Sequence, residues 1–308
     1  RPRQLELSLD PAEVPLSDRG GEAHEATVPA AERHARGQYF TPFPVVDLVL
    51  DLCEGTAPAS ILDPACGSGR FLLAARRRWP GAALSGWDTD PTALALAGEN
   101  LSGRVGLPAG SRLNALAGRA DGSLSDSPAR LAVRSFLESP GEAEFDLVVG
   151  NPPYVRRRGE RRDVYVDFVE HAARHLRPGG RLAFVLSSAW LDVQYGLAVR
   201  QVLLAEFAVE WIAESSVERW FPGAKVNTMV LVARREPDGG RRAAQTVAFA
   251  EVDRLPAQPR VVRRETQGSL PTDRPWGPLL RAPAAWLQRW TDGGTLGALA
   301  TVSRGFTT

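Results

Sequence analysis

The sequence predicts an α/β fold: a doubly wound, mostly parallel sheet of seven strands with helices on both faces. From about residue 37 to residue 235, short apolar runs alternate with stretches of helical periodicity. This alternation is typical of parallel strands joined by crossover helices. The first apolar run leads into a glycine turn, and a later one leads into Asn151-Pro-Pro-Tyr154. Because the carboxyl ends of parallel strands share one edge of a sheet, we expect both turns to border the same site.

Each expected strand is a short apolar run, and each expected helix lies between two such runs. The strands are Ser60–Ala65, Ala83–Asp88, Arg112–Asn114, Phe145–Gly150, Arg181–Ser187, Val209–Ala213 and Thr228–Arg234. The helices are Gly69–Arg78, Pro91–Glu99, Asp163–Leu176 and Gly196–Glu206. A proline suits the first turn of the helix that begins at Pro91. The polar stretch from about Ala115 to Glu144 is expected to be an insertion or a long loop.

Composition divides the 308 residues into four segments. Residues 1–34 are rich in Pro, Glu, Asp and Gly and are expected to be flexible. Residues 35–235 form the main α/β domain. Residues 236–285 contain Pro-Asp-Gly-Gly and repeated prolines, which indicate a linker or transition. Residues 286–308 are expected to begin a further domain that this chain does not complete.

The composition of the whole chain excludes several classes of protein. Hydrophobic residues make up 44% of the chain, and its formal net charge of +1 gives no sign of general affinity for nucleic acid. No apolar run approaches the roughly 18 residues that a membrane-spanning helix needs, and the N-terminus lacks an export pattern. We therefore expect a cytoplasmic protein without membrane contact. Two cysteines and four histidines argue against a disulfide framework and a structural zinc site, so no metal is expected.

The first turn, Asp63-Pro-Ala-Cys-Gly-Ser-Gly69, has the features of a cofactor site. Gly67 and Gly69 allow the backbone to pass close to a ligand at the end of the first strand. The second strand ends at Asp88, whose carboxylate can accept hydrogen bonds from both hydroxyls of a ribose. A dinucleotide site would have a third glycine near position 72, where this chain has leucine. The sequence therefore predicts an adenosine-type cofactor without a pyrophosphate.

The second turn, Asn151-Pro152-Pro153-Tyr154, suits chemistry on an aromatic amine. Its two prolines fix the backbone. The side-chain oxygen of Asn151 and the carbonyl of Pro152 can accept both hydrogens of such an amine, which directs the nitrogen lone pair toward an electrophilic methyl group. Tyr154 can stack on a base that has rotated out of a duplex. We interpret these four residues as catalytic.

The two turns together resemble the motifs of the adenine-specific amino-group DNA methyltransferases of bacterial restriction–modification systems, with the cofactor motif preceding the catalytic one. The resemblance covers about residues 37–235, which would be the catalytic domain. It implies a class I S-adenosylmethionine-dependent methyltransferase fold and S-adenosylmethionine as the cofactor. The implied activity is methylation of the N6 amine of a flipped-out adenine in a specific sequence of double-stranded DNA, in restriction–modification or phage defence.

The resemblance also implies partners and further site residues. A target-recognition domain would begin near Leu296, and a restriction endonuclease, fused or separate, would be the partner. The loop Trp220–Asn227 is similar to one whose aromatic residue contacts the flipped base, so Phe221 joins the catalytic set. Asn114 takes the place of an acid that touches the cofactor adenine. The implied cofactor-binding residues are Gln38, Tyr39, Phe40, Thr41, Asp63, Ala65, Gly67, Gly69, Phe71, Asp88 and Asn114.

Contacts with DNA must come from local clusters of positive charge, because the net charge is close to zero. One cluster follows the catalytic turn directly, and we expect it, with Lys225, to bind phosphates. It comprises Arg156, Arg157, Arg158, Arg161 and Arg162. A second cluster is Arg260, Arg263 and Arg264.

Alternative activities use the same residues. The amine-gripping turn would also serve cytosine N4, a protein glutamine or an RNA amine, and the domain could be a catalytically inactive DNA-binding subunit. Methylation of cytosine C5 requires a cysteine nucleophile, and neither Cys53, in an apolar helix, nor Cys66, in the cofactor turn, suits that role. His171 and His175 lie four apart on one helix, and we expect them to be packed or solvated rather than metal-bound.

Overall fold

A computed structural model of the protein describes residues 40–55, 57–102, 129–155, 163–194, 196–216, 220–221, 227–256, 258–283 and 285–287. These residues form one nine-stranded sheet in the order β3-β2-β1-β4-β5-β7-β6-β8-β9. Its strands are β1 (Ser60–Asp63), β2 (Ala83–Asp88), β3 (Ala129–Val133), β4 (Phe145–Gly150), β5 (Leu176–Ser187), β6 (Phe207–Ser215), β7 (Thr228–Arg235), β8 (Thr246–Val252) and β9 (Arg260–Thr266). The α-helices are α3 (Phe43–Asp51), α4 (Arg70–Arg78), α5 (Pro91–Ser102), α7 (Val164–His175), α8 (Gly196–Glu206), α9 (Gly239–Ala244) and α10 (Gly277–Arg281).

The sheet is mostly parallel, as the sequence predicted. β3, β2, β1, β4 and β5 are parallel neighbours. β7 runs antiparallel between β5 and β6, β8 lies parallel to β6, and β9 pairs antiparallel with β8 at the edge. The carboxyl ends of β1, β2, β4, β5, β6 and β8 therefore lie at the same edge of the sheet.

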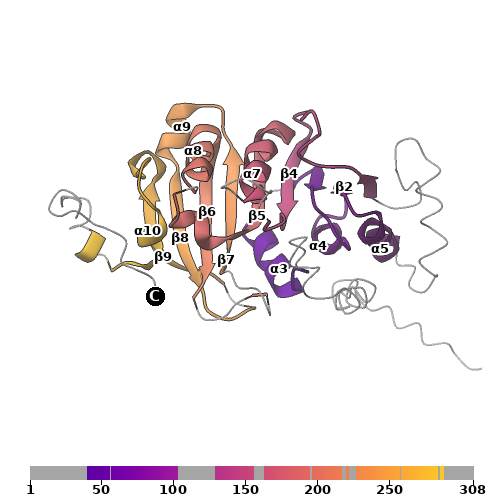
Figure 1. Ribbon diagram of the computed structural model, residues 1–308, viewed down its shortest axis with the longest axis horizontal. Coiled ribbons are helices and arrows are strands. Elements are labelled where there is room, and N and C mark those ends of the chain that lie inside the picture. The colour runs from indigo at the N-terminus through magenta and orange to yellow at the C-terminus, as the bar shows by residue number, and fades with distance from the viewer. Residues whose placement is uncertain are drawn as a thin grey trace, which may run out of the picture.

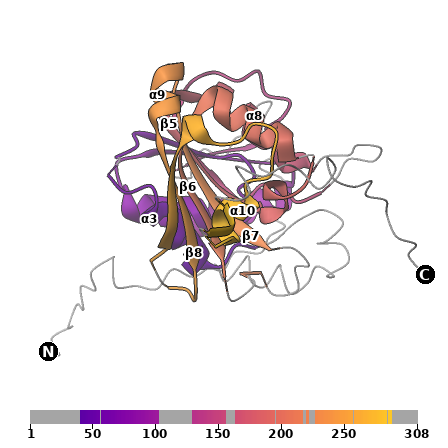
Figure 2. The ribbon, with the colours of Figure 1, turned by 90° about the vertical axis from the view of Figure 1, so that its left-hand side faces the viewer.

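Helices cover both faces of the sheet. α3, α4 and α5 pack with one hydrophobic cluster, and α7, α8 and α10 pack with the other (Figure 1). Figure 2 shows α3 and α8 on opposite sides of the strands. β5 illustrates why both faces are apolar: Val185 belongs to the first cluster, while its neighbours Phe184 and Leu186 belong to the second. Successive side chains of a strand point to opposite faces, so a strand covered on both sides must be apolar throughout.

The sheet has nine strands, two more than the seven expected. The additional strands, β8 and β9, lie within residues 236–285, which the sequence had suggested as a linker. The linker interpretation was based on the many prolines of this segment. Pro256 and Pro259 lie in the connection between β8 and β9, so they do not interrupt the pairing of β8 with β9. The expected domain boundary at residue 235 is therefore corrected, because the sheet continues to Thr266.

The strand beside β2 also differs from the prediction. The expected third strand, Arg112–Asn114, falls outside the described residues, and β3 instead comes from Ala129–Val133, inside the stretch expected to be an insertion or loop. Its sequence fits an edge strand, because Ala129 and Leu131 are buried while Arg130 between them is exposed. The polar residues that follow the third strand are therefore Arg134 and Ser135.

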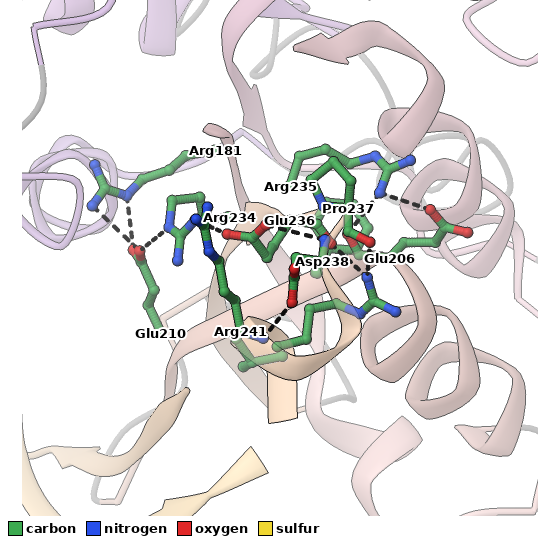
Figure 3. A network of polar contacts seen from close by, with 12 residues as sticks. Arg181, Glu206, Glu210, Arg234, Arg235, Glu236, Pro237, Asp238 and Arg241 are labelled. Carbon is green, nitrogen blue, oxygen red and sulfur yellow. Dashed lines mark hydrogen bonds and ion pairs between the residues drawn. The ribbon is translucent and has the colours of Figure 1, made fainter. Parts of the chain in front are cut away.

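A network of ion pairs joins the strands near the start of β6 and the end of β7 (Figure 3). Glu210 of β6 accepts from Arg181 of β5 at 2.7 Å and lies 3.5 Å from Arg234 of β7. Arg234 also pairs with Glu236 at 2.8 Å. Charged side chains thus link three neighbouring strands away from the edge where β4 ends. Within the described ranges, no helix is long and apolar enough to cross a membrane.

Candidate active site

A cavity of about 630 Å³ lies at the carboxyl ends of β1, β2 and β4. This volume is within the usual range for small-molecule sites in proteins. The cavity is lined by nine of the residues predicted from sequence: Phe40, Thr41, Asp63, Ala65, Gly67, Phe71, Asp88, Asn151 and Pro153. The two turns expected to share one site therefore do so.

The glycine turn after β1 packs against α5 and is hydrogen-bonded to it. Gly67 and Gly69 have φ angles of +52° and +85°, in the left-handed region that favours glycine. A Cβ at Gly69 would also lie 3.1 Å from Cβ of Ala97 on α5, so the turn packs closely on that helix. Asn100 of α5 donates to the Ser68 carbonyl at 2.9 Å. These contacts fix the backbone where we expected the cofactor.

Two carboxylates flank this turn, that of Asp63 buried and that of Asp88 partly buried. Asp63 is 1% exposed, and burial raises its pKa well above the usual value, with a smaller contribution from the negative charge of Asp88. Burial also raises the pKa of Asp88, although its oxygens accept hydrogen bonds from the amides of Gly67 at 2.8 Å and Asp90 at 2.9 Å. A pair of desolvated acids favours a positively charged ligand, because such a ligand stabilises their ionised forms. The wall therefore fits S-adenosylmethionine, which carries a sulfonium and an ammonium group.

The side chain of Asn151 is hydrogen-bonded at both ends of its carboxamide. Its Nδ2 donates to Oγ1 of Thr41 at 3.1 Å, and its Oδ1 accepts from the hydroxyl of Tyr154. The Tyr154 oxygen also lies 3.1 Å from the carbonyl oxygen of Val185 on β5. The Tyr154 ring stands edge-on to Tyr165, with 6.3 Å between centroids. Three separate segments of the chain therefore determine where the Asn151 amide lies.

Some predicted site residues do not line the cavity themselves. Among the described residues, Gly69, Pro152, Tyr154 and Phe221 do not line the cavity. Phe221 is 3% exposed and packs in the hydrophobic cluster on the α3 side of the sheet, whereas the sequence interpretation had placed it against the target base. Outside the described residues lie Gln38, Tyr39, Asn114, Arg156, Arg157, Arg158, Arg161, Arg162 and Lys225.

The cavity also contains residues that sequence reasoning missed. Arg70, the first residue of α4, donates to the Thr41 carbonyl at 3.1 Å, and its guanidinium lies over the rings of Phe40 and Phe43 at 5.5 and 5.6 Å. The sequence feature that could have identified Arg70 is its position directly after the glycine turn. Four further lining residues follow β3, and they were missed because the third strand was expected at Arg112–Asn114. They are Arg134, Ser135, Phe136 and Leu137.

His171 and His175 are packed against this β3 loop. The Ser139 hydroxyl lies 2.8 Å from His175 Nε2, and His171 Nε2 donates to the Ser139 carbonyl at 2.9 Å. Both imidazoles also contact the ring of Phe136, with centroids 4.8 Å (His175) and 4.9 Å (His171) away. The two histidines therefore support a wall of the cavity. Within the described part of the chain, no group of three or more His, Cys, Asp or Glu side chains is arranged to hold a metal ion.

The buried imidazole of His175 should make stability depend on pH. Burial, together with the positive charges of His171, Arg134 and Arg174, lowers its pKa from 6.5 to about 4. Between these two values the unfolded chain binds the proton more readily than the folded one. The free energy of unfolding should therefore fall by about 2 kcal/mol as the pH decreases from 6.5 to 4, with the full value present above that window.

Urea unfolding of the wild type and the His175→Gln variant across this pH range measures the effect. The amide of glutamine can still donate to Ser139 but does not titrate. The fall in stability should therefore be smaller in the variant, and equal falls in both proteins would show that His175 is not responsible.

A family model for N-6 DNA methylases matches residues 20–264. The chain belongs to this family. It is 31% identical over 216 residues to the type II methyltransferase M.PaeR7I of Pseudomonas aeruginosa, covering 60% of this chain and 38% of that protein. It is 30% identical over 260 residues to the type II methyltransferase M.XamI of Xanthomonas campestris pv. amaranthicola, covering 74% and 46%. The chain thus spans less than half the length of these relatives, and the resemblance inferred from its two turns is confirmed.

The fold matches solved methyltransferase structures. The M protein of the type I restriction enzyme EcoKI superposes with a TM-score of 0.53 at 22% identity, covering 70% of this chain and 49% of that one. The predicted class I S-adenosylmethionine-dependent methyltransferase fold is therefore confirmed.

Proposed function

We propose that the protein transfers the methyl group of S-adenosylmethionine to the N6 amine of adenine in DNA, as part of a restriction–modification system. The observation that carries this proposal is the Asn151 carboxamide, fixed on the wall of a cavity that is also lined by Asp63 and Asp88. The family match to N-6 DNA methylases and the type II methyltransferase relatives support the acceptor.

The residues of the catalytic turn would bind and activate the acceptor amine. Asn151 Oδ1 and the Pro152 carbonyl accept its two hydrogens, which localises the nitrogen lone pair for attack. Bound S-adenosylmethionine supplies an electrophilic methyl group. Pro153 keeps the turn rigid, and the hydroxyl of Tyr154 holds the carboxamide of Asn151. The target base must leave the duplex to reach this cavity, at a cost of a few kcal/mol.

The cofactor would lie along the glycine turn. Asp88 accepts from the ribose hydroxyls, Asp63 lies toward the methionine end, and the backbone from Gly67 to Gly69 borders the ligand. Phe40, Thr41, Ala65 and Phe71 complete the predicted wall of this site.

Replacing Asp88 with alanine should weaken cofactor binding at least about tenfold, because the ribose loses a charged acceptor and the Gly67 amide loses its partner. Isothermal titration of S-adenosylmethionine measures this. The control is Asp253→Ala, which removes an exposed carboxylate bonded to Ser216 outside the cavity. Equal affinity in the two variants would contradict the ribose-binding role.

DNA contacts would come from the arginines that directly follow the catalytic turn, Arg156 to Arg162, and from Lys225. The second basic cluster is partly neutralised in the structure. Arg260 pairs with Glu251, and Arg263 lies 3.4 Å from Glu265. We therefore assign the phosphate contacts to the first cluster and propose a restriction endonuclease as the partner of the system.

The test is transfer of a labelled methyl group from S-adenosylmethionine by the full-length protein, offered duplex DNA, RNA and protein in parallel. Nucleoside analysis of the DNA should identify N6-methyladenine. N4-methylcytosine instead would contradict the base assignment, and label confined to RNA or protein would contradict DNA as the acceptor. Measurable cofactor binding without transfer to any acceptor would favour an inactive DNA-binding subunit.

A further inference from the structure

A carboxamide can accept hydrogen bonds from an amine only when its oxygen faces that amine. The terminal torsion of asparagine has two orientations of similar energy, which exchange the oxygen and the NH₂ group. In one orientation Asn151 presents an acceptor to a base amine, and in the other it presents donors, which repel the amine hydrogens. Catalysis by Asn151 therefore requires a group that holds its NH₂ away from the base.

Thr41 meets that requirement. Its Oγ1 accepts from Asn151 Nδ2 at 3.1 Å, across 110 positions of sequence. Asn151 Oδ1 accepts from the Tyr154 hydroxyl, and a carbonyl oxygen has two lone pairs, so it retains acceptor capacity for a base amine. With Thr41 accepting from Nδ2 and Tyr154 donating to Oδ1, the structure holds the amide in the orientation that accepts.

Thr41 is itself firmly placed. It is 5% exposed and precedes α3. Its carbonyl accepts from Arg70, whose guanidinium packs against Phe40 and Phe43. Because Arg70 follows the glycine turn directly, one guanidinium joins the cofactor turn to the segment that orients Asn151.

We propose that Thr41 is a positioning residue for the methyl-transfer step, acting on Asn151 through its hydroxyl, and that Arg70 holds Thr41 in place for this task. This inference rests on the proposed function. It differs from the role expected from sequence, in which Thr41 only binds the cofactor. The two roles predict different kinetics, since a group that orients Asn151 affects the rate of transfer while a cofactor ligand affects affinity.

The test compares Thr41→Val with Thr41→Ser in the full-length protein. Valine keeps the shape and removes the acceptor, whereas serine keeps the hydroxyl. In Thr41→Val we expect kcat to fall about tenfold or more, with the cofactor dissociation constant changed less than about threefold. Thr41→Ser should restore most of kcat. A rise in the dissociation constant at unchanged kcat, or equal kcat in all three proteins, would overturn the proposal.

A double-mutant cycle shows whether the effect passes through Asn151. In single-turnover assays, Thr41→Val should slow transfer in the wild-type background but add no further loss in the Asn151→Ala background. Additive losses would mean that Thr41 acts independently of Asn151 and would overturn the proposal.

A readout without DNA separates this inference from the proposed function. In protein labelled with ¹⁵N-asparagine, the side-chain NH₂ signals of Asn151 are identified by their loss in Asn151→Ala. They should shift and exchange faster with solvent in Thr41→Val but not in Thr41→Ser. If the wild type methylates no DNA, the proposed function fails while this result still tests the positioning. Unchanged signals in Thr41→Val would overturn the positioning, whatever the acceptor.

Discussion

Replacing Asn151 with alanine is expected to slow methyl transfer about a hundred- to a thousandfold, the usual loss when one preorganised hydrogen-bond partner of a transition state is removed. The variant loses the oxygen that accepts from the amine, but it keeps the carboxylates of Asp63 and Asp88 that line the same cavity. Affinity for S-adenosylmethionine should therefore change little. Single-turnover transfer to DNA and isothermal titration of the cofactor measure the two effects separately.

Asn227→Ala is the matched control for this variant. Asn227 has an exposed side chain just before β7, and the structure uses its backbone carbonyl, which accepts from Ser188, rather than its amide. The control should transfer methyl groups at the wild-type rate. Full activity in Asn151→Ala would show that the amine is held by another group and would remove the central residue from the mechanism.

The parts of the site that were predictable from sequence are those fixed by local pattern. Asp63, Asp88 and Asn151 each end or follow an apolar strand, and the shared edge of parallel strands brings them to one cavity. The turn after β1 has left-handed backbone at Gly67 and Gly69, and the two glycines predicted this because glycine adopts that conformation readily.

The remaining features depend on contacts between distant segments. β3 was missed because its neighbour β2 lies before a long insertion, and no local pattern says which later run pairs with it. Arg70 reads as an ordinary helix residue until its guanidinium is seen on the Thr41 carbonyl, 29 positions earlier. Phe221 was placed by analogy with a loop, and burial in the core is decided by tertiary packing.

The extension of the sheet beyond β7 leads to an expected effect on stability. Replacing Arg281 with alanine should lower the free energy of unfolding by about 3 kcal/mol, because it leaves a buried carboxylate without its charge partner. Arg281, at the end of α10, donates to both oxygens of Glu214 on β6, at 2.7 and 2.8 Å. The side chain of Glu214 is only 7% exposed, whereas that of Arg281 is 41% exposed, which keeps the expected loss at the low end for a buried pair.

Arg260→Ala provides the comparison, because it breaks the pair with Glu251 on β8 while the side chain of Arg260 is 65% exposed. Exposed pairs contribute at most about 1 kcal/mol, so this variant should unfold almost as the wild type does. Adding Glu214→Gln to Arg281→Ala should recover part of the loss, since it removes the uncompensated charge. Urea unfolding of the wild type, the two single variants and the double variant measures these differences in the free energy of unfolding. If Arg281→Ala cost no more than Arg260→Ala, α10 would be held by its apolar contacts alone; a larger cost would mean that the ion pair fastens α10 to the same edge of the sheet that carries the cavity.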